Sequence, residues 1–220
     1  MADIVISKEI KKACPEIALG LIRAKVNTKE SSRDLWKEIN SYCDELIKEI
    51  KIEELSSLPR IKDGRETYKK LGKAPGKYRL SSEALIRRVL QGKGVYKINN
   101  IVDINNLISL KSKFPVGSYN IKNLHLPVTL GVGKIGNKYK GIGKELINIE
   151  NLPVLMDFEG AFGSPTSDSE RAMIADDAEE ILMCIFSFSE EAGLEEYLNY
   201  GKELLEKYAD GKEILGTVLK

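Results

Sequence analysis

The segment from Met156 to Ser169 gathers side chains that could do chemistry into one loop. It sets carboxylates, hydroxyls and glycines directly after an apolar run, where a rigid strand can present the functional groups of a loop. The residues predicted to contact a substrate are Asp157, Glu159, Ser164, Thr166 and Asp168. An alternative interpretation is a turn whose Asp and Ser side chains cap its own backbone.

Asn105 and Asn106 are the second candidate pair, within a predicted helix that asparagine does not intrinsically favour. A buried asparagine amide must be hydrogen-bonded, whereas one that faces a pocket can donate to a carbonyl or hydroxyl of a ligand. Both a structural role and a ligand contact fit these two residues.

Other patterns that often carry chemistry have structural explanations here. Gly131–Gly136 matches the dinucleotide-binding string, but no helix start follows it, so we predict a hairpin turn. His125 is the single histidine, which does not supply a multi-histidine metal centre, and Cys184 lies in an apolar run typical of a core. Three cysteines without CxxC spacing argue against a disulfide framework and a structural zinc site. We therefore expect no metal and no cofactor.

Charge is strongly segregated along the chain, although the net charge is only +1. Residues 60–97 hold twelve Lys and Arg against three acids, whereas residues 157–180 hold eight acids against one arginine. A concentrated positive charge favours a partner with a phosphate backbone, so nucleic acid is the first partner to consider. The residues expected to contact it are Arg65, Lys69, Lys73, Lys77, Arg79, Arg87 and Arg88. Solvated helix faces and loops are the alternative.

With 220 residues, 42% of them hydrophobic, the chain can bury a sizeable core as one domain. Charges follow the N-terminal Ile4–Ile6 too soon for a signal sequence, and the apolar run Ile181–Phe186 is too short to span a bilayer. Together with the cysteine usage, this predicts a cytoplasmic protein that does not cross a membrane.

The elements that must position the candidate residues change from helical to β along the chain. We expect a buried strand over 17–26, a helix capped by Ser31 or Ser32, two short helices over 63–71 and 81–91, and a helix from Asn99 toward Lys113. Beyond Asn120 the pattern predicts strands over 126–130, 152–158 and within 172–187, with a hairpin through Tyr139. A helix over about 190–208 closes the chain.

An ordered set of short motifs resembles a known family. Ile98-Asn99-Asn100-Ile101-Val102-Asp103, then Asn106, Pro115-Val116, Tyr119 and Asn120, is similar to a segment of the B3/B4 tRNA-binding and editing domain of the bacterial phenylalanyl-tRNA synthetase beta subunit. Upstream residues resemble stand-alone proteins that carry only that domain: Arg65, Tyr68-Lys69, Pro75, Tyr78-Arg79, Ser82 to Leu85 and Arg87-Arg88. The resemblance covers about residues 60–175.

This resemblance implies an α+β fold with a mixed or antiparallel β-sandwich-like core and flanking helices. We expect one domain of this kind over 1–220, with 1–59 as an N-terminal strand and helix packed on it and 190–220 as a C-terminal helical portion. In the synthetase the domain hydrolyses tyrosine wrongly attached to the phenylalanine tRNA. Here Asn106 falls on the family's pocket asparagine and Asn105 replaces its threonine, whereas Gly117 falls on its histidine and Pro165 lies near its loop glutamate.

We therefore expect a tRNA-binding protein that removes a mischarged amino acid in trans, by metal-independent hydrolysis assisted by the substrate's ribose hydroxyl. Asn105, Asn106 and Ser118 are expected to orient the ester or the water, and an acid of the 157–168 loop to bind the substrate's α-ammonium. Two alternatives remain: an RNA-binding module that has lost the editing site, and a protein with a pocket for a free amino acid.

Overall fold

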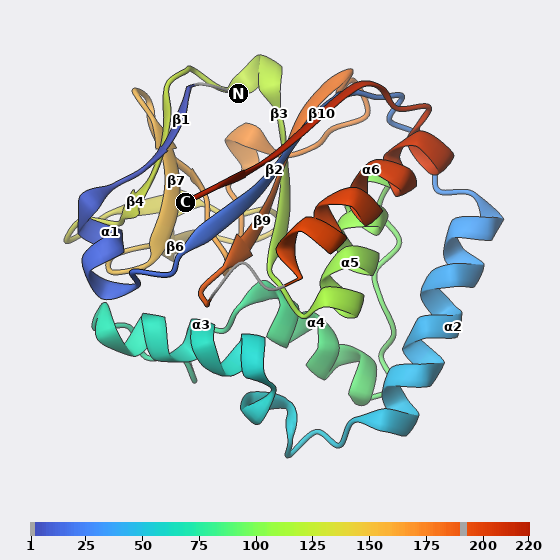
Figure 1. Ribbon diagram of the computed structural model, residues 1–220, viewed down its shortest axis with the longest axis horizontal. Coiled ribbons are helices and arrows are strands. Elements are labelled where there is room, and N and C mark those ends of the chain that lie inside the picture. Colours follow the sequence, from blue (N-terminus) through green and yellow to red (C-terminus); the bar gives the residue numbers. More distant parts are fainter. Residues whose placement is uncertain (1–2, 190–192) are drawn as a thin grey trace.

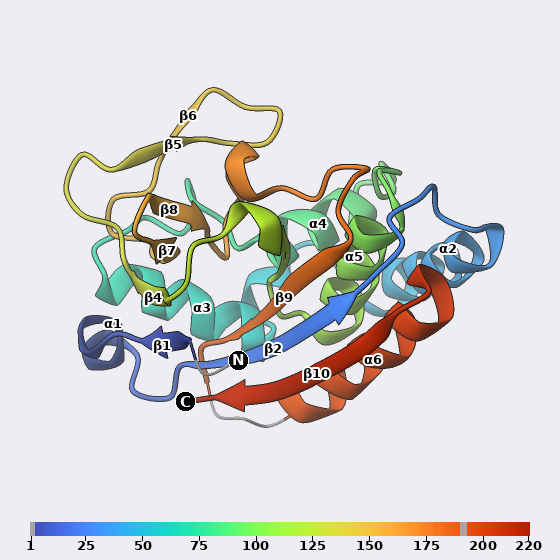
Figure 2. The same ribbon diagram turned by 90° about the horizontal axis from the view of Figure 1, so that it is seen from above.

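Two stacked β-sheets with helices on the outer face of one of them form the architecture of the computed structural model, which describes residues 3–189 and 193–220 (Figures 1 and 2). Sheet A has the order β1 (Ile4–Ile6), β4 (Val128–Val132), β7 (Pro153–Asp157), β8 (Gly160–Gly163). Sheet B has the order β10 (Lys212–Leu219), β2 (Ala18–Lys25), β9 (Glu180–Ser187), β3 (Val116–Asn120). A separate hairpin pairs β5 (Lys138–Lys140) with β6 (Leu146–Asn148).

The helices follow the sequence signals for their ends. They are α1 (Lys8–Ala13), α2 (Arg33–Glu49), α3 (Pro59–Lys70), α4 (Ser81–Leu90), α5 (Asn100–Ser112) and α6 (Leu194–Ala209), with short 3₁₀ turns η1 (Leu55–Ser57), η2 (Ile121–Asn123) and η3 (Glu170–Ala172). Ser32 caps α2 by accepting from the Leu35 amide at 3.2 Å, and Asn99 caps α5 by accepting from the Val102 amide at 3.0 Å. None of these helices is long and apolar enough to traverse a bilayer.

Strand β9 shows how sheet B separates two cores. Leu182, Cys184 and Phe186 point toward sheet A and join the core between the two sheets, together with residues of α1 and α3. Met183 and Ile185 point the other way, into the core formed with α2, α4, α5 and α6. Two facing sheets flanked by helices confirm the predicted α+β fold with a sandwich-like core, and the parallel pairing of β1 with β4 makes it mixed.

Most predicted elements are present, but the ends of the chain differ from expectation. The portion over 1–59 is not simply packed on the domain, because β2 is an inner strand of sheet B and β1 belongs to sheet A. The portion over 190–220 is not only helical: α6 is followed by β10, which pairs antiparallel with β2. The first residues of the predicted closing helix, 190–192, lie outside the described residues.

Three local expectations differ in detail from the structure. Helix α3 begins at Pro59, before the predicted start at residue 63, because the missing N–H of a proline costs nothing at the first helical position. Val116–Asn120, for which no strand was predicted, forms the edge strand β3. The Gly131–Gly136 segment ends β4 and starts no helix, as predicted, but it leads to β5, which pairs with β6 and not with β4, so the turn is not a hairpin. Cys14, Cys43 and Cys184 are free and buried.

Candidate functional site

The loop after β8 is held in shape by its own serine and aspartate side chains. Ser164 Oγ accepts from the backbone amides of Thr166 and Ser167, at 3.3 and 3.1 Å. Asp168 Oδ1 accepts from the amide of Ser164 at 3.2 Å. These are the local caps that Ser and Asp provide in turns. The loop therefore has the capping structure of the alternative interpretation, and it also fixes the position of one carboxylate.

Asp168 is that carboxylate, and its environment is suited to proton transfer. Tyr119 on β3 donates its hydroxyl proton to Asp168 Oδ1 at 2.8 Å. Burial raises the pKa of Asp168 to about 6, although the bonds from Tyr119 and Ser164 and the charge of Lys144 oppose the shift. The residue keeps partial exposure. A carboxylate with a pKa near 6 is mostly ionised at neutral pH and is a stronger base than an ordinary aspartate.

Glycines on both sides make room for this pair. A Cβ at Gly117 would lie 2.5 Å from the Tyr119 hydroxyl oxygen and 3.1 Å from Asp168 Oδ2. A Cβ at Gly163 would collide with the same hydroxyl. Gly117 is the position at which the resemblance places a histidine; in this chain the Tyr119 hydroxyl and the Asp168 carboxylate occupy the room that a side chain there would need.

Asn105 and Ser118 form a separate pair on the opposite face of β3. The Ser118 hydroxyl donates to Asn105 Oδ1 at 2.9 Å, and both residues are buried between β3 and α5. Side chains alternate along a strand, so Ser118 points toward α5 while Gly117 and Tyr119 point toward sheet A and Asp168. The expectation that the central helix and the acidic loop wall one common cavity is therefore wrong for these residues. Asn106 is half-buried, and its side chain has no hydrogen bond to another described residue.

The 164–168 loop also contacts the two basic helices. The Tyr68 hydroxyl on α3 lies 2.8 Å from Thr166 Oγ1, and the amide of Ser81, at the start of α4, donates to the carbonyl oxygen of Pro165 at 2.7 Å. These contacts place the ends of α3 and α4 beside the loop that carries Asp168.

Three of the predicted RNA-binding arginines converge on one buried acid, Glu83 of α4. Arg65 Nη1 lies 3.0 and 3.1 Å from its two carboxylate oxygens, and Arg87 Nη2 and Arg79 Nε lie 3.7 and 3.9 Å from Oε1. The Glu83 side chain is fully buried, whereas the three guanidinium groups keep partial exposure. Part of the positive charge of these helices is therefore neutralised inside the protein.

The remaining predicted RNA-binding residues differ in how much charge they present. Lys73 is buried, and its ammonium donates to the carbonyl oxygens of Asn148 and Glu150, so it ties α3 to the β6 region. Lys69 pairs with Glu66 at 2.7 Å on the exposed side of α3. Lys77 is exposed. Arg88 stacks 3.7 Å above the ring of Tyr96.

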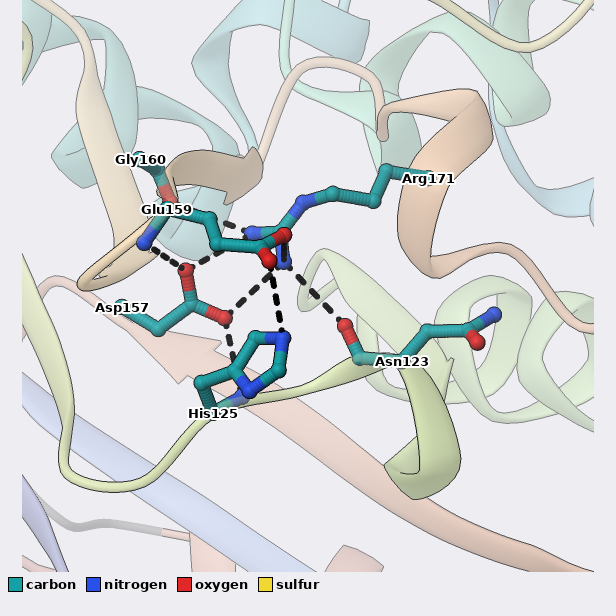
Figure 3. Close-up of polar contacts among 6 residues, drawn as sticks. All are labelled: Asn123, His125, Asp157, Glu159, Gly160 and Arg171. Atoms are coloured by element: carbon teal, nitrogen blue, oxygen red, sulfur yellow. Dashed lines mark hydrogen bonds and ion pairs between the residues drawn. The ribbon is translucent and has the colours of Figure 1, made fainter.

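Asp157 and Glu159 belong to a cluster organised by Arg171, which sequence reasoning did not single out (Figure 3). Arg171 binds both oxygens of Asp157, at 2.9 and 3.0 Å, and Glu159 at 3.3 Å. His125 lies 3.0 Å from Glu159 and donates its backbone amide to Asp157. Burial opposes the charged form of Asp157, but the bonds from Arg171 and from the amides of His125 and Glu159 lower its pKa below the usual value.

The sequence did carry a signal for this cluster, because Arg171 is the only cation among eight acids in residues 157–180. Glu83 had a similar signal, as a lone acid between flanking cations. Tyr119 and Tyr139 gave no such signal, because only the fold brings them to the 164–168 loop. Within the described residues, His, Cys, Asp and Glu side chains form no group of three that could hold a metal ion.

Comparisons with known proteins agree with this architecture. The model of the B3/4 domain family matches residues 63–201. A solved structure of an N-terminal fragment of the phenylalanyl-tRNA synthetase beta-subunit from Pyrococcus horikoshii has a similar fold, with a TM-score of 0.50 and 11% sequence identity. The match covers 99% of this chain and 54% of that one, so the chain spans about half the length of that fragment. No curated protein matches the sequence significantly. Because the family match covers more than half of its residues, the chain belongs to the B3/4 domain family.

Proposed function

We propose that this protein binds the aminoacylated 3′ end of tRNA and hydrolyses a mischarged aminoacyl ester. The observation that carries the proposal is the B3/4 domain match over residues 63–201. The similar fold of a fragment of a tRNA synthetase subunit supports the same class of substrate. Lys69, Lys77, Arg79, Arg87 and Arg88 give the RNA a cationic surface, and the ends of α3 and α4 lie beside the 164–168 loop.

Asp168 is the residue that we assign as general base. In this assignment a water beside Oδ2 gives its proton to the carboxylate and attacks the carbonyl carbon of the ester. The bond from that carbon to the ribose oxygen breaks, and the proton returns to the ribose oxygen, so the products are the free amino acid and tRNA. Tyr119 donates to Oδ1, so Oδ2 is the oxygen that we propose takes the proton.

The other predicted site residues take different roles in this proposal. Asn106 lies on α5, which packs on the face of β3 opposite to Asp168, so we do not place it at the ester. Asn105 and Ser118 bind each other and position α5 against β3. Ser164 and Thr166 shape the loop, and Asp157 and Glu159 bind Arg171. We therefore assign none of these seven residues to the reacting atoms.

Lys69, Lys77, Arg79, Arg87 and Arg88 remain the proposed RNA contacts; they lie on α3, on α4 and on the segment between them. Each keeps part of its cationic group exposed, and a phosphate can replace or join the present partner. Arg65 and Lys73 are more enclosed. The Arg65 guanidinium pairs with Glu83, and the Lys73 ammonium donates to the carbonyl oxygen of Glu150 beside β6.

A panel of mischarged tRNAs, incubated with the purified protein, tests the hydrolytic proposal. We expect at least one aminoacyl-tRNA to lose its amino acid much faster than in buffer, with Asp168→Asn as the inactive control. If no member of the panel is deacylated faster than in buffer, the enzymatic proposal is wrong.

A second candidate function is RNA binding without hydrolysis. It is favoured by Gly117 at the family's histidine position and by the separation of the Asn105–Ser118 pair from Asp168 by β3. This alternative predicts tRNA binding that weakens steeply with salt and yields no product. Salt-insensitive binding would count against it.

A further inference from the structure

A second cationic surface lies on the β5–β6 hairpin, far in sequence from the basic helices. Residues 134–144 contain four lysines and no acid: Lys134, Lys138, Lys140 and Lys144. All four are exposed. In the part of the chain that the structure describes, Lys140 alone among them pairs with a carboxylate, that of Glu170 at 2.9 Å. Three of the four hairpin lysines therefore have no carboxylate partner among the described residues.

This hairpin is fixed to the segment that carries Asp168. The Tyr139 hydroxyl donates to Ser164 Oγ at 3.1 Å and to the Ser167 carbonyl oxygen. The amide of Ile142 donates to the Asp168 carbonyl oxygen at 3.2 Å, and Lys144 Nζ donates to Ser167 Oγ at 3.3 Å. Figure 2 shows the hairpin above the β7–β8 pair, on the side away from α6. The hairpin is thus anchored to the segment that carries the candidate base.

A cavity of about 430 Å³ opens between the hairpin and the turn that joins β7 to β8. The hydrogen-bond donors in its lining include Asn137, Lys138, Lys140 and Arg171. The lining also includes one acid, Glu159, which contacts Arg171 and His125. Ser169 also lines it; the residue is 3% exposed, and its hydroxyl oxygen has no partner among the described residues. Sites for small ligands typically measure roughly 300–1,000 Å³, so this volume suits one nucleotide unit and not a duplex.

We propose that the hairpin lysines and this cavity bind the phosphodiester backbone of single-stranded RNA next to its 3′ end. The inference deepens the proposed function and rests on it: Ser169, the residue after Asp168, lines the cavity, so a strand held here lies next to the segment that carries the candidate base. Lysine ammonium groups neutralise phosphates without reading sequence, and the cavity admits a single unpaired nucleotide. The hairpin is then the part of the site that positions the RNA strand.

Binding of a fluorescent single-stranded RNA with a free 3′ ribose, measured by anisotropy over a salt series, tests the proposal. The probe carries no amino acid, so the result does not depend on hydrolysis. We expect Lys134→Gln/Lys138→Gln to weaken binding roughly tenfold and to lower the salt-dependence slope by about 1.4, at about 0.7 per phosphate contact in single strands. Because both lysines are exposed, we expect the thermal unfolding midpoint of the variant to be unchanged, and this measurement shows whether the variant is folded.

The matched control is Lys62→Gln/Lys70→Gln, which removes the same charge from exposed positions on α3. We expect the RNA affinity of this control and the slope of its salt dependence to stay within a factor of two of those of the unmodified protein. Equal losses in both double variants would overturn the proposal in favour of general electrostatic attraction, and unchanged binding in the hairpin variant would also overturn it. Displacement of the RNA by adenosine monophosphate at concentrations close to the RNA dissociation constant would assign the cavity to a free nucleotide instead.

Discussion

Two polar pairs flank strand β3, and they differ in almost every property that matters for chemistry. Asn105 and Ser118 are neutral, mutually hydrogen-bonded and enclosed between β3 and α5. Tyr119 and Asp168, on the other face, form a charged pair whose carboxylate has a pKa of about 6. Ser118 and Tyr119 are adjacent in sequence, yet strand alternation sends them into different cores. Proximity in sequence to a family motif therefore does not place a residue in the same site.

The largest effect that would test this difference is expected from Asp168→Asn. Asparagine keeps the size and accepts the bonds from Tyr119 and Ser164, but it cannot take a proton from water. We expect hydrolysis of the best substrate in the panel to fall by about 10²–10⁴-fold, the usual contribution of a general base. Single-turnover deacylation measures this fall, and tRNA affinity should stay unchanged. A rate within threefold of the unmodified protein would remove Asp168 from the chemistry.

The pH dependence sharpens the assignment. The rate should rise with pH through a midpoint near 6 and then level off, because the ionised carboxylate is the active form. The stability of the fold should change in the opposite sense. Because the pKa of Asp168 is raised in the folded protein, its contribution to stability is fully present below about pH 4 and is lost as the pH rises through about 6. At pH 7.5 the free energy of unfolding of Asp168→Asn should therefore exceed that of the unmodified protein by up to about 3 kcal/mol, and this difference should vanish near pH 4. Urea unfolding at both pH values measures this.

Gly117→Ala is expected to have the next largest effect, on both stability and rate. The new methyl group would lie 2.5 Å from the Tyr119 hydroxyl oxygen, which must move away from Asp168. We expect a loss of about 1–3 kcal/mol in unfolding free energy, the range for overpacking in a core. Gly76→Ala is the matched control, because a Cβ there meets no atom within 4 Å. Equal losses at both glycines would show that the crowding beside Asp168 has no special consequence.

The smallest effect is expected from the pair on the other face. Asn105→Ala leaves the buried Ser118 hydroxyl without its acceptor, which should cost about 1–2 kcal/mol of unfolding free energy. Removing both partners in Asn105→Ala/Ser118→Ala should restore part of this loss, because no polar group is then left unpaired. The deacylation rate should stay within threefold throughout. A fall as large as that of Asp168→Asn would place the chemistry on the α5 side of β3.

The two cationic regions teach a related lesson about charge. Residues 60–97 carry an excess of nine positive charges in sequence, but Glu83 and the β6 region engage several of them. The hairpin over 134–144 has an excess of only four, and three of its lysines have no carboxylate partner among the described residues. The strength of a basic surface depends on which charges are already paired, and a charge count along the chain does not report this.

The sequence by itself determined the local elements and the family. Capping residues and apolar spacing located α2 and α5, the apolar runs located β2, β7 and β9, and the ordered motifs from Arg65 to Asn120 indicated the B3/4 domain. The tertiary structure alone decided that β2 is an inner strand, that β10 closes sheet B, and that Tyr119 and Tyr139 bind the 164–168 loop. The reason is physical: capping and periodicity act over a few neighbouring residues, whereas strand order, burial and the pKa of Asp168 arise from contacts between segments far apart in the chain.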